Sequence, residues 1–292
     1  MIVTYFAEEP RVAGLLEAVG SQVAQVVIVD NTPAPAPPTS ITIRPGIDRI
    51  ANHANLGLAH AQNQGVAHLA ARGCTHVVLF DQDSLPAPDM VKHLLAAWRE
   101  LHVAGVRVAA LGPAWRDRHS GRSAPFVRIG WGGMRAAADD PVTECDTLVS
   151  SGCLIPLAAF DAIGPMDATL FIDQIDTEWG LRAQRLGYRL YGVRSAVLIH
   201  GIGESFVRPW FAPARTVPVH APVRDYYLVR NTIAVFFRRA APWRWRLLQL
   251  LRLPALIVVL VTQMPPRRTR LRYVARGLVD GLRGRLGAAP AA

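Results

Sequence analysis

Short apolar runs alternate with segments of helical periodicity along the first 200 residues of the chain. An apolar run bounded by turn residues is typical of a buried strand, whereas apolar residues three and four apart are typical of an amphipathic helix. This alternation predicts βαβ units and a largely parallel sheet. The predicted strands lie within residues 2–6, 25–31, 76–83, 106–113, 148–156 and 188–200, and the predicted helices are 10–22, 58–72, 88–102 and 176–187.

Two regions depart from this alternation. Between residues 112 and 147 the periodicity weakens, which predicts loops or antiparallel strands at a sheet edge. Residues 224–239 have the spacing of an amphipathic helix with arginines at its ends. The next run, 247–264, is strongly apolar, but Arg252 and Pro254 interrupt it. Since a membrane-spanning helix needs about 20 apolar residues, we expect this run to lie in the membrane interface or to re-enter it, with a tilted span as the alternative.

The positive charge of the chain is concentrated at its C-terminal end. The formal net charge is +10, and twelve arginines from residue 238 onward stand against a single acid, Asp280. This basic end suits an anionic surface, either nucleic acid or acidic lipid. Trp243 and Trp245 lie among the arginines just before the apolar run, as is typical at lipid headgroups. The interleaving of basic and apolar residues favours a bilayer surface over a nucleic-acid duplex.

Length and cysteine content set further bounds. The chain has 292 residues, 51% of them hydrophobic, which suffices for one large domain or two modest ones. Its three cysteines are scattered without the paired spacing of a metal site, and an odd number argues against a disulfide framework. The first ten residues lack the basic region and apolar core of a secretory signal. We therefore expect a reducing, cytosolic environment.

Two aspartates follow an apolar strand at a place where ligands bind in open α/β sheets. Asp81 and Asp83 come directly after the run 77–80, and the carboxyl ends of such strands form the binding edge of the sheet. Mg²⁺ takes one or two protein carboxylates and completes its shell with water and substrate phosphates. Asp-x-Asp therefore suits a metal-bound diphosphate. The alternative is a solvated turn in which Asp83 or Ser84 caps the next helix.

Further polar residues lie near strand ends and helix starts. Asp30 ends the predicted strand 25–31, where its carboxylate can accept the imide N–H of a pyrimidine base. Asn55 and Asn63 belong to a glycine turn that leads into a helix, and the N-terminus of a helix favours an anion. They can bond ribose or phosphate. The alternatives are a helix cap for Asn55 and an exposed polar position for Asn63.

Seven segments occur in an order that is found in one enzyme family: VTYF, VIVDN, NLGLAHAQNQG, LFDQDS, SGCLI, FIDQIDTEWGLRAQRLGY and LIHGIG. Over residues 2–210 the chain resembles the family 2 inverting glycosyltransferases, and Asp-Gln-Asp-Ser is typical of their bacterial rhamnosyltransferase branch. The resemblance implies the GT-A fold, an α/β, Rossmann-like mixed sheet with flanking helices. It also implies a nucleotide-sugar donor, dTDP-L-rhamnose in that branch, and a divalent metal, Mg²⁺ or Mn²⁺. We expect a GT-A domain over residues 1–223 and a membrane-associating basic and apolar helical region over 224–292.

The resemblance implies which residues bind the donor and the metal. Asp30 reads the base, with Thr4 and Tyr5 lining its pocket. The full set of expected donor-binding residues is Thr4, Tyr5, Asp30, Asn55, Asn63 and Asp81. Asp81 and Asp83 form the metal motif, with Asp83 the more direct ligand. His200 matches a histidine that completes the metal site in some relatives, and imidazole suits Mn²⁺; the alternative is a histidine satisfied at a strand end.

Inversion by direct displacement requires a base on the face opposite the leaving diphosphate. The segment IDQIDTEW supplies Asp173, Asp176 and Glu178. The matching family position makes Asp176 the base, near the start of a helix. Glu178 then supports Asp176 or orients the acceptor, and Asp173 is a loop or capping residue.

Three more residues are candidates for the acceptor side. Trp179 and Arg182 are three residues apart on one helix face, so that Trp179 can stack on a sugar and Arg182 can meet a phosphate or the neighbouring acids. The alternative is a core tryptophan and a surface arginine. Trp131 is a candidate for a mobile flap near the acceptor.

The sequence therefore predicts a metal-dependent rhamnosyltransferase that adds sugar to a lipid-linked or cell-surface glycan at the inner face of the cell membrane. A first alternative keeps the fold and uses UDP-galactofuranose or a UDP-N-acetylhexosamine as the donor. Alternatives of another class are a nucleic-acid binder that uses the arginine-rich end and a catalytically silent membrane-associated scaffold. The intact set Asp81, Asp83, Asp176 and His200 argues against the scaffold.

Overall fold

Four parallel strands form the first sheet of the protein. The structure is a computed structural model that describes residues 1–35, 46–117, 123, 125–130, 133–200, 205–213 and 216–290. Because the four strands are parallel, their carboxyl ends meet at one edge of the sheet. Their order in the sheet is β3 (Ile47–Ala51), β2 (Val26–Asp30), β1 (Ile2–Thr4) and β5 (Phe80–Asp81).

A second sheet of six strands is mixed. Its central strands β7 and β12 are parallel to each other, and the remaining pairs are antiparallel. The order is β10 (Val142–Cys145), β12 (Arg189–His200), β7 (Val108–Asp117), β11 (Leu154–Pro156) and β4 (His76–Val78), with β6 (Leu85–Pro86) also paired to β12. Two antiparallel hairpins are separate from both sheets: β8 (Val127–Gly130) with β9 (Gly133–Ala136), and β13 (Ser205–Val207) with β14 (Val217–Val219). Of the loops or antiparallel strands expected between residues 112 and 147, the structure has antiparallel strands: β10 at the edge of the second sheet and the separate β8–β9 hairpin.

Residues 76–81 link the two sheets. The first half of this stretch, β4, pairs with β11, and the second half, β5, pairs with β1. Between them, Leu79 donates its N–H to the carbonyl of Cys153 (3.1 Å) and accepts the N–H of Gly152 (2.6 Å). The predicted single strand is therefore divided between two sheets, and Asp81 is the last residue of its second half.

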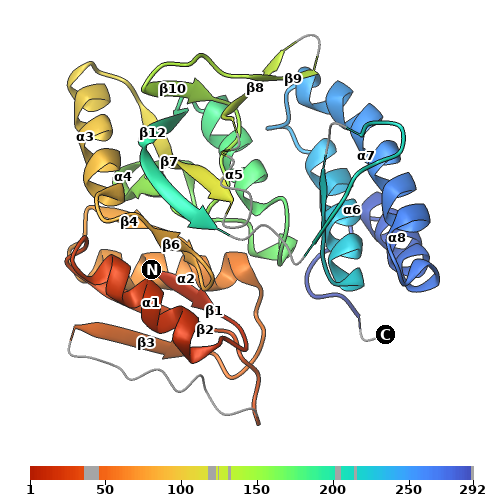
Figure 1. Ribbon diagram of the computed structural model, residues 1–292, viewed down its shortest axis with the longest axis horizontal. Coiled ribbons are helices and arrows are strands. Elements are labelled where there is room, and N and C mark those ends of the chain that lie inside the picture. The colour runs from red at the N-terminus through yellow and green to blue at the C-terminus, as the bar shows by residue number, and fades with distance from the viewer. Residues whose placement is uncertain are drawn as a thin grey trace.

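Helices cover both faces of the first sheet, as Figure 1 shows. Alternate residues of a strand point to opposite faces: Val27 and Val29 of β2 pack with α2, whereas Ile28 packs with α1 and α3. This burial on two faces explains why β2 is apolar without interruption. The helices of this domain are α1 (Glu9–Gly20), α2 (Leu58–Ala71), α3 (Met90–Val103), α4 (Leu157–Ile163) and α5 (Ile175–Arg185), with a short 3₁₀ turn at Ala168–Leu170.

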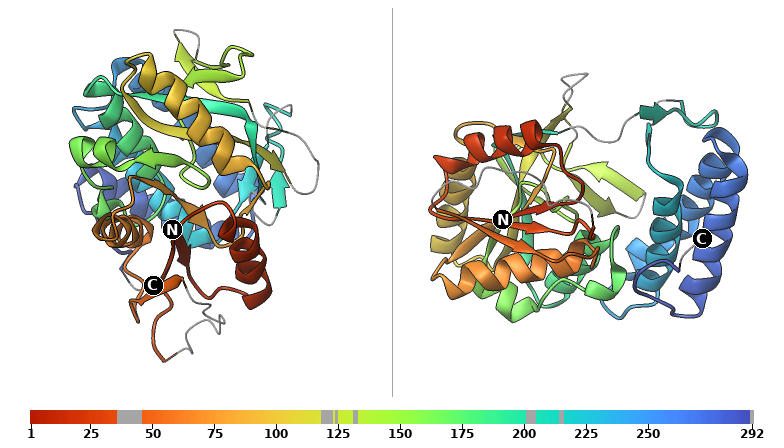
Figure 2. Two further views of the ribbon diagram at one scale, coloured as in Figure 1. Left: turned by 90° about the vertical axis from the view of Figure 1, so that its left-hand side faces the viewer. Right: turned by 90° about the horizontal axis from the view of Figure 1, so that it is seen from below.

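Three C-terminal helices stand beside the sheet domain (Figures 1 and 2). They are α6 (Pro222–Phe236), α7 (Trp243–Gln263) and α8 (Arg267–Leu282). Glycines bring α6 and α8 together, since a Cβ on Gly277 would lie 2.7 Å from the carbonyl oxygen of Tyr226. A buried ion pair of 2.7 Å between Asp225 and Arg270 also joins these two helices.

The C-terminal helices extend what the sequence predicts. Helix α6 confirms the amphipathic helix expected at 224–239. Helix α7 is unbroken over 21 residues with Pro254 inside it, so the expected interruption of the apolar run does not end the helix. By length and composition alone α7 is suited to cross a membrane, and only 17% of its apolar window is buried. Helix α8 and strand β3 are additions that the sequence pattern did not indicate.

Candidate active site

The carboxyl ends of three neighbouring strands bring three of the predicted residues together. Thr4 at the end of β1 is in register with Asp30 at the end of β2, and Val3 is in register with Asp81 at the end of β5. Thr4 is completely buried, and its hydroxyl has no hydrogen-bond partner. The strand register thus places Thr4, Asp30 and Asp81 along one edge, as the sequence predicted for a donor pocket.

Asp30 is held as a buried carboxylate. It is 2% exposed, it accepts the N–H of Thr32 at 3.0 Å, and it forms an ion pair with Arg49 of β3. Burial favours the neutral acid, but the bonds from Thr32 and Arg49 outweigh it and lower the pKa of Asp30. A fixed negative charge with unused acceptor positions can still receive a base N–H. The sequence analysis did not find Arg49, because β3 is too polar to be recognised as a strand.

The other expected donor residues lie in different surroundings. Tyr5 is 45% exposed, and its main chain is paired with the side-chain amide of Gln82 through bonds of 2.8 and 3.2 Å. Asn55 is exposed and accepts the N–H of Gly57 at 3.1 Å, which closes the turn before α2; the helix itself has no side-chain cap. Asn63 donates to the carbonyl of Met166 and accepts its N–H, at 2.8 and 2.9 Å. These bonds join α2 to the loop that carries Met166.

The turn after β5 carries the predicted metal motif. Asp81 and Asp83 are both half-buried. Ser151 fixes the turn, since its hydroxyl accepts the N–H of Asp81 at 3.1 Å and shares a hydrogen bond of 2.6 Å with the hydroxyl of Ser84. Two carboxylates on a fixed turn fit a cation that takes most of its ligands from water and phosphate.

Among the described residues, no cluster of three or more His, Cys, Asp or Glu side chains could hold a metal ion by itself. His200 ends β12, but its side chain lies outside the described part of the structure. Trp131 also lies outside the described residues. The donor set that can be described is therefore the carboxylate pair of Asp81 and Asp83.

Asp176 lies in the first turn of α5 and is half-buried. Burial raises its pKa to about 6, against the opposing effect of the Thr177 N–H, and the carboxylates of Asp173 and Asp81 raise it further. Asp176 also accepts the N–H of Ser150, and the next residue, Ser151, accepts the N–H of Asp81, so the predicted base and the metal motif are bonded to neighbouring residues of one loop. A carboxyl group with a pKa near the working pH is suited to general base catalysis.

The three residues expected on the acceptor side have structural contacts instead. Glu178 is 3% exposed and is paired with Arg182 at 2.9 and 3.1 Å, and Arg182 also donates to the carbonyl of Ile163. Trp179 is 3% exposed, and its indole N–H donates to the carbonyl of Gly164 at 2.9 Å. A buried indole offers no face to a sugar. Trp179 therefore lies in the core, as the alternative stated, whereas Arg182 is half-buried and meets the neighbouring acid Glu178.

Helix α6 supplies site residues that the sequence analysis missed. Arg224 is bidentate to Asp173 at 2.5 and 3.3 Å, and Thr232 accepts a hydrogen bond from Gln174 at 3.1 Å. Asn231 donates to the carbonyls of Leu170, Ile172 and Asp173 at 2.7–3.0 Å. The sequence shows that α6 contains charged and polar residues. It does not show which loop these residues contact.

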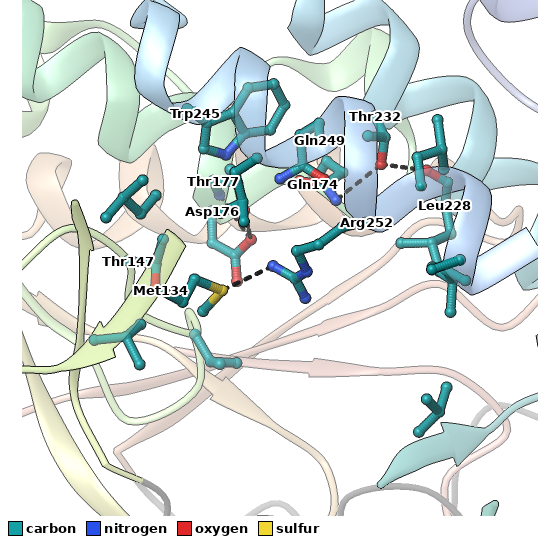
Figure 3. A pocket seen from close by; sticks show the side chains of 18 of the residues that line it. Met134, Thr147, Gln174, Asp176, Thr177, Leu228, Thr232, Trp245, Gln249 and Arg252 are labelled. Atoms are coloured by element: carbon teal, nitrogen blue, oxygen red, sulfur yellow. Dashed lines mark hydrogen bonds between the residues drawn. The ribbon is translucent and has the colours of Figure 1, made fainter. Parts of the chain in front are cut away.

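A mostly apolar cavity of about 590 Å³ adjoins Asp176. Asp176 and Thr177 form part of its polar lining, and Arg252 of α7 approaches from the other side beside Met134 (Figure 3). Trp245 and further apolar side chains of α7 complete the wall on that side. The cavity is therefore lined both by the predicted base and by α7, the helix that is long and apolar enough to cross a membrane.

Comparison with known proteins decides the family. The family model of "Glycosyl transferase family 2" matches residues 1–155, more than half of the chain. The chain belongs to this family. It is therefore a glycosyltransferase, and residues 1–155 contain Thr4, Asp30, Asp81 and Asp83. A curated relative, the dTDP-rhamnosyl transferase RfbF of Shigella flexneri, is 27% identical over 305 residues and covers 98% of this glycosyltransferase and 96% of its own length.

Solved structures support the GT-A fold. GalNAc-T7 with UDP, GalNAc and Mn²⁺ is similar with a TM-score of 0.57 and 12% identity, and the match covers 97% of this chain but 55% of that one, so the chain spans about half of its length. TarS 1-349 of S. aureus in complex with UDP gives 0.54 and 14%, over 97% and 88%. The mannosyltransferase PcManGT of Pyrobaculum calidifontis, with GDP-Man and Mn²⁺, gives 0.53 and 17%, over 96% and 85%. At such identities the likeness concerns the fold alone.

A glycine before α2 lies in close contact with Phe171, and its replacement gives a testable prediction. Gly57 has φ +88°, and a Cβ there would lie 2.7 Å from the Phe171 ring. We expect Gly57→Ala to lower the free energy of unfolding by about 1–3 kcal/mol, because the left-handed backbone and the contact both oppose a side chain. Urea unfolding measures this. Gly14→Ala, in open space on α1, should be neutral or stabilising; equal losses in both variants would contradict the prediction.

Proposed function

We propose that this glycosyltransferase transfers L-rhamnose from dTDP-L-rhamnose to a glycan acceptor with inversion at the anomeric carbon. The observation that carries the mechanism is that Asp176, with its pKa raised to about 6, accepts the N–H of Ser150, next to Ser151, which is bonded to Asp81 of the metal motif. The donor is proposed from the relative named as a dTDP-rhamnosyl transferase. Its base then meets Asp30 and Thr4, and its diphosphate meets the turn that carries Asp81 and Asp83.

The chemistry is a single displacement. The acceptor hydroxyl oxygen attacks the anomeric carbon, the bond to the departing diphosphate oxygen breaks, and Asp176 takes the hydroxyl proton. Asp81 and Asp83 would hold a divalent metal, which supplies positive charge to the leaving diphosphate when bound. The two neighbours crystallised with Mn²⁺ support such an ion in this fold. No covalent enzyme intermediate is required, because one displacement inverts the centre.

The acceptor is proposed to be a lipid-linked glycan. The cavity beside Asp176 is lined mainly by apolar side chains, and the charged side chain of Arg252 also lines it. Such a lining suits a lipid chain next to a charged phosphate better than it suits a free oligosaccharide, since burial of apolar surface is favourable and a sugar would leave its hydroxyls unpaired. One side of the cavity is formed by α7, from which a lipid could enter if this helix contacts a membrane.

A donor panel tests the function. Thermal unfolding should shift upward most with dTDP-L-rhamnose in the presence of Mn²⁺, because a ligand that binds only the folded state stabilises it. Transfer to a lipid-linked acceptor, followed by mass spectrometry of the product, should require the same donor. Stabilisation and transfer with UDP-galactofuranose or a UDP-N-acetylhexosamine, but not with dTDP-L-rhamnose, would favour the alternative donor.

Peripheral association with the inner face of the cell membrane is the second part of the proposal. One face of α7 carries exposed apolar residues at helical spacing, including Leu247 (46% exposed), Leu250 (58%), Leu251 (72%) and Val258 (42%). Exposed arginines lie nearby on α7 and α8, among them Arg244, Arg268 and Arg272. An apolar stripe next to arginines is typical of a helix that lies on an anionic bilayer.

Leu250→Gln together with Leu251→Gln should weaken binding to vesicles that contain anionic lipid. Burial of a leucine contributes about 1.5–3 kcal/mol, so we expect a loss of at least tenfold in the partition coefficient, measured by co-sedimentation. Val103→Gln removes an even more exposed apolar side chain (87%) from α3 and should leave binding unchanged. Equal vesicle binding by the double variant and the native chain would exclude this face of α7 as the membrane contact.

A further inference from the structure

The turn before the predicted base is held by α6. This turn, residues 170–174, connects the 3₁₀ segment to α5 and therefore sets where Asp176 stands. Asn231 donates hydrogen bonds to three of its carbonyls, and Arg230 donates to one of the same carbonyls, that of Leu170, at 3.1 Å. Tyr227 stacks on Phe171 with 5.1 Å between ring centroids. The C-terminal helices are thus part of the catalytic architecture and not only a membrane contact.

The backbone of this turn requires such support. Phe171, Asp173 and Gln174 have φ values of +66°, +66° and +63°, a region that side chains other than glycine seldom adopt. Each such residue is unfavourable by about 1–3 kcal/mol, and it persists only where its surroundings impose it. The N–H of Leu58 adds one bond, to the carbonyl of Phe171, from the side of α2. All the other contacts described above come from α6.

Arg224 is the charged member of this set. Its guanidinium is bidentate to Asp173, and its Nη1 lies 3.4 Å from Nδ1 of His220. Burial lowers the pKa of Arg224, but the carboxylates of Asp173, Asp81 and Asp225 outweigh it. Arg224 therefore places a positive charge among the carboxylates at the edge of the site. It does so from α6, one of the three C-terminal helices.

From these contacts we infer that Arg224 is a positioning residue for Asp176, which acts through Asp173. Arg224 fixes the carboxylate of Asp173 and, with Asn231, the turn that leads into α5. It also compensates a negative charge beside Asp176, so that the base remains ionised at neutral pH. The inference rests on the proposed function, because it assumes that Asp176 is the base. It names a residue from the C-terminal helices as necessary for transfer.

The electrostatic surroundings of Asp176 define what a change at Arg224 can do. Among the residues that the structure describes, the groups that act on its charge are the carboxylates of Asp173 and Asp81, the thiol of Cys153, and the N–H groups of Thr177 and Ser150. Arg252 lines the same cavity from α7. If Arg224 loses its charge, Asp173 becomes an uncompensated anion and the pKa of Asp176 rises. If Asp173 is neutralised as well, the pKa of Asp176 returns.

The test compares Arg224→Gln, Arg224→Lys, Asp173→Asn and the double variant Arg224→Gln with Asp173→Asn at saturating Mn²⁺. For Arg224→Gln we expect kcat to fall ~10- to 100-fold, the range for a misplaced catalytic group, with the Kd of dTDP unchanged. Its acid limb in the pH profile should move upward by roughly 0.5–1 unit, and the double variant should return the limb to its native position. Arg224→Lys should recover part of kcat.

Arg189→Gln is the matched control, since Arg189 pairs with Glu144 at 3.2 Å on a different part of the surface. It should leave kcat, Kd and the pH profile unchanged. Thermal unfolding of each variant separates misfolding from misplacement. A loss of dTDP affinity as large as the loss of kcat would overturn the inference and make Arg224 a donor ligand. An acid limb that stays displaced in the double variant would also overturn it.

Failure of the proposed function remains distinguishable from failure of this inference. If the native chain transfers sugar from none of the donors, the proposed function is wrong. The pKa of Asp176 can then still be followed by ¹³C NMR titration of its carboxyl carbon, without any turnover. An upward shift in Arg224→Gln that disappears in the double variant supports the coupling, and an unchanged pKa contradicts it.

Discussion

Asp176→Asn should lose transfer and keep the donor. An amide cannot accept the acceptor's proton, so we expect kcat to fall about 100- to 10,000-fold, the usual contribution of a general base. The affinity for dTDP should change little, because the expected nucleotide contacts, Thr4 and Asp30, lie on β1 and β2. Steady-state kinetics with dTDP-L-rhamnose and isothermal titration with dTDP measure the two effects.

The pH profile of the native enzyme gives an independent check. Burial raises the pKa of Asp176 to about 6, and only the ionised form can take a proton. Transfer should therefore increase as the pH rises through about 6 and be lost below it. Asp161→Asn, an exposed position on α4, is the matched control and should retain native rates. Native turnover by Asp176→Asn would show that the base is another residue.

Asp83→Ala should abolish metal-dependent turnover. Alanine cannot bind the cation that would neutralise the leaving diphosphate. We therefore expect a loss of about 100-fold or more in kcat/KM. The loss should persist across a titration of Mn²⁺, and the thermal stabilisation by dTDP with Mn²⁺ should decrease. Stopped assays at several Mn²⁺ concentrations measure both the rate and its metal dependence.

Asp89→Ala provides the comparison for that variant. Asp89 precedes α3 in the same segment, its side chain is 65% exposed, and its nearest ion-pair partner, Lys92, is 4.0 Å away. Its removal should leave the rate and the Mn²⁺ dependence unchanged. If Asp83→Ala were as active as Asp89→Ala at every Mn²⁺ concentration, a carboxylate-held metal would have no part in this reaction.

Much of the sheet domain follows from local pattern. Apolar runs such as Val26–Asp30 are buried on both faces. Because such strands are continuously apolar, they can be recognised from the sequence. Strand β3 was missed because its residues are half-exposed and include Asp48 and Arg49. The sequence also did not predict that residues 76–81 are divided between two sheets, because an apolar run does not show which strands it pairs with.

The candidate site was predictable where short motifs follow strand ends. Asp30, Asp81 and Asp176 take positions that suit the roles expected from the family resemblance. Trp179 was misjudged because helical spacing shows that residues share a face but not whether that face meets the core or the cleft. Arg224 and Asn231 were missed because their partners lie about 50 to 60 residues earlier in the chain, beyond any local pattern.

The close crossing of α6 and α8 at Gly277 has a consequence for how the enzyme would meet its substrate. Glycine at this crossing leaves little room for the helices to slide, and α6 is bonded to the turn that precedes Asp176. If α7 rests on a bilayer, as proposed, this packing would hold the reaction centre at one height above the lipid plane. The enzyme would then accept lipid-linked acceptors whose head groups have one length and would reject shorter or longer ones.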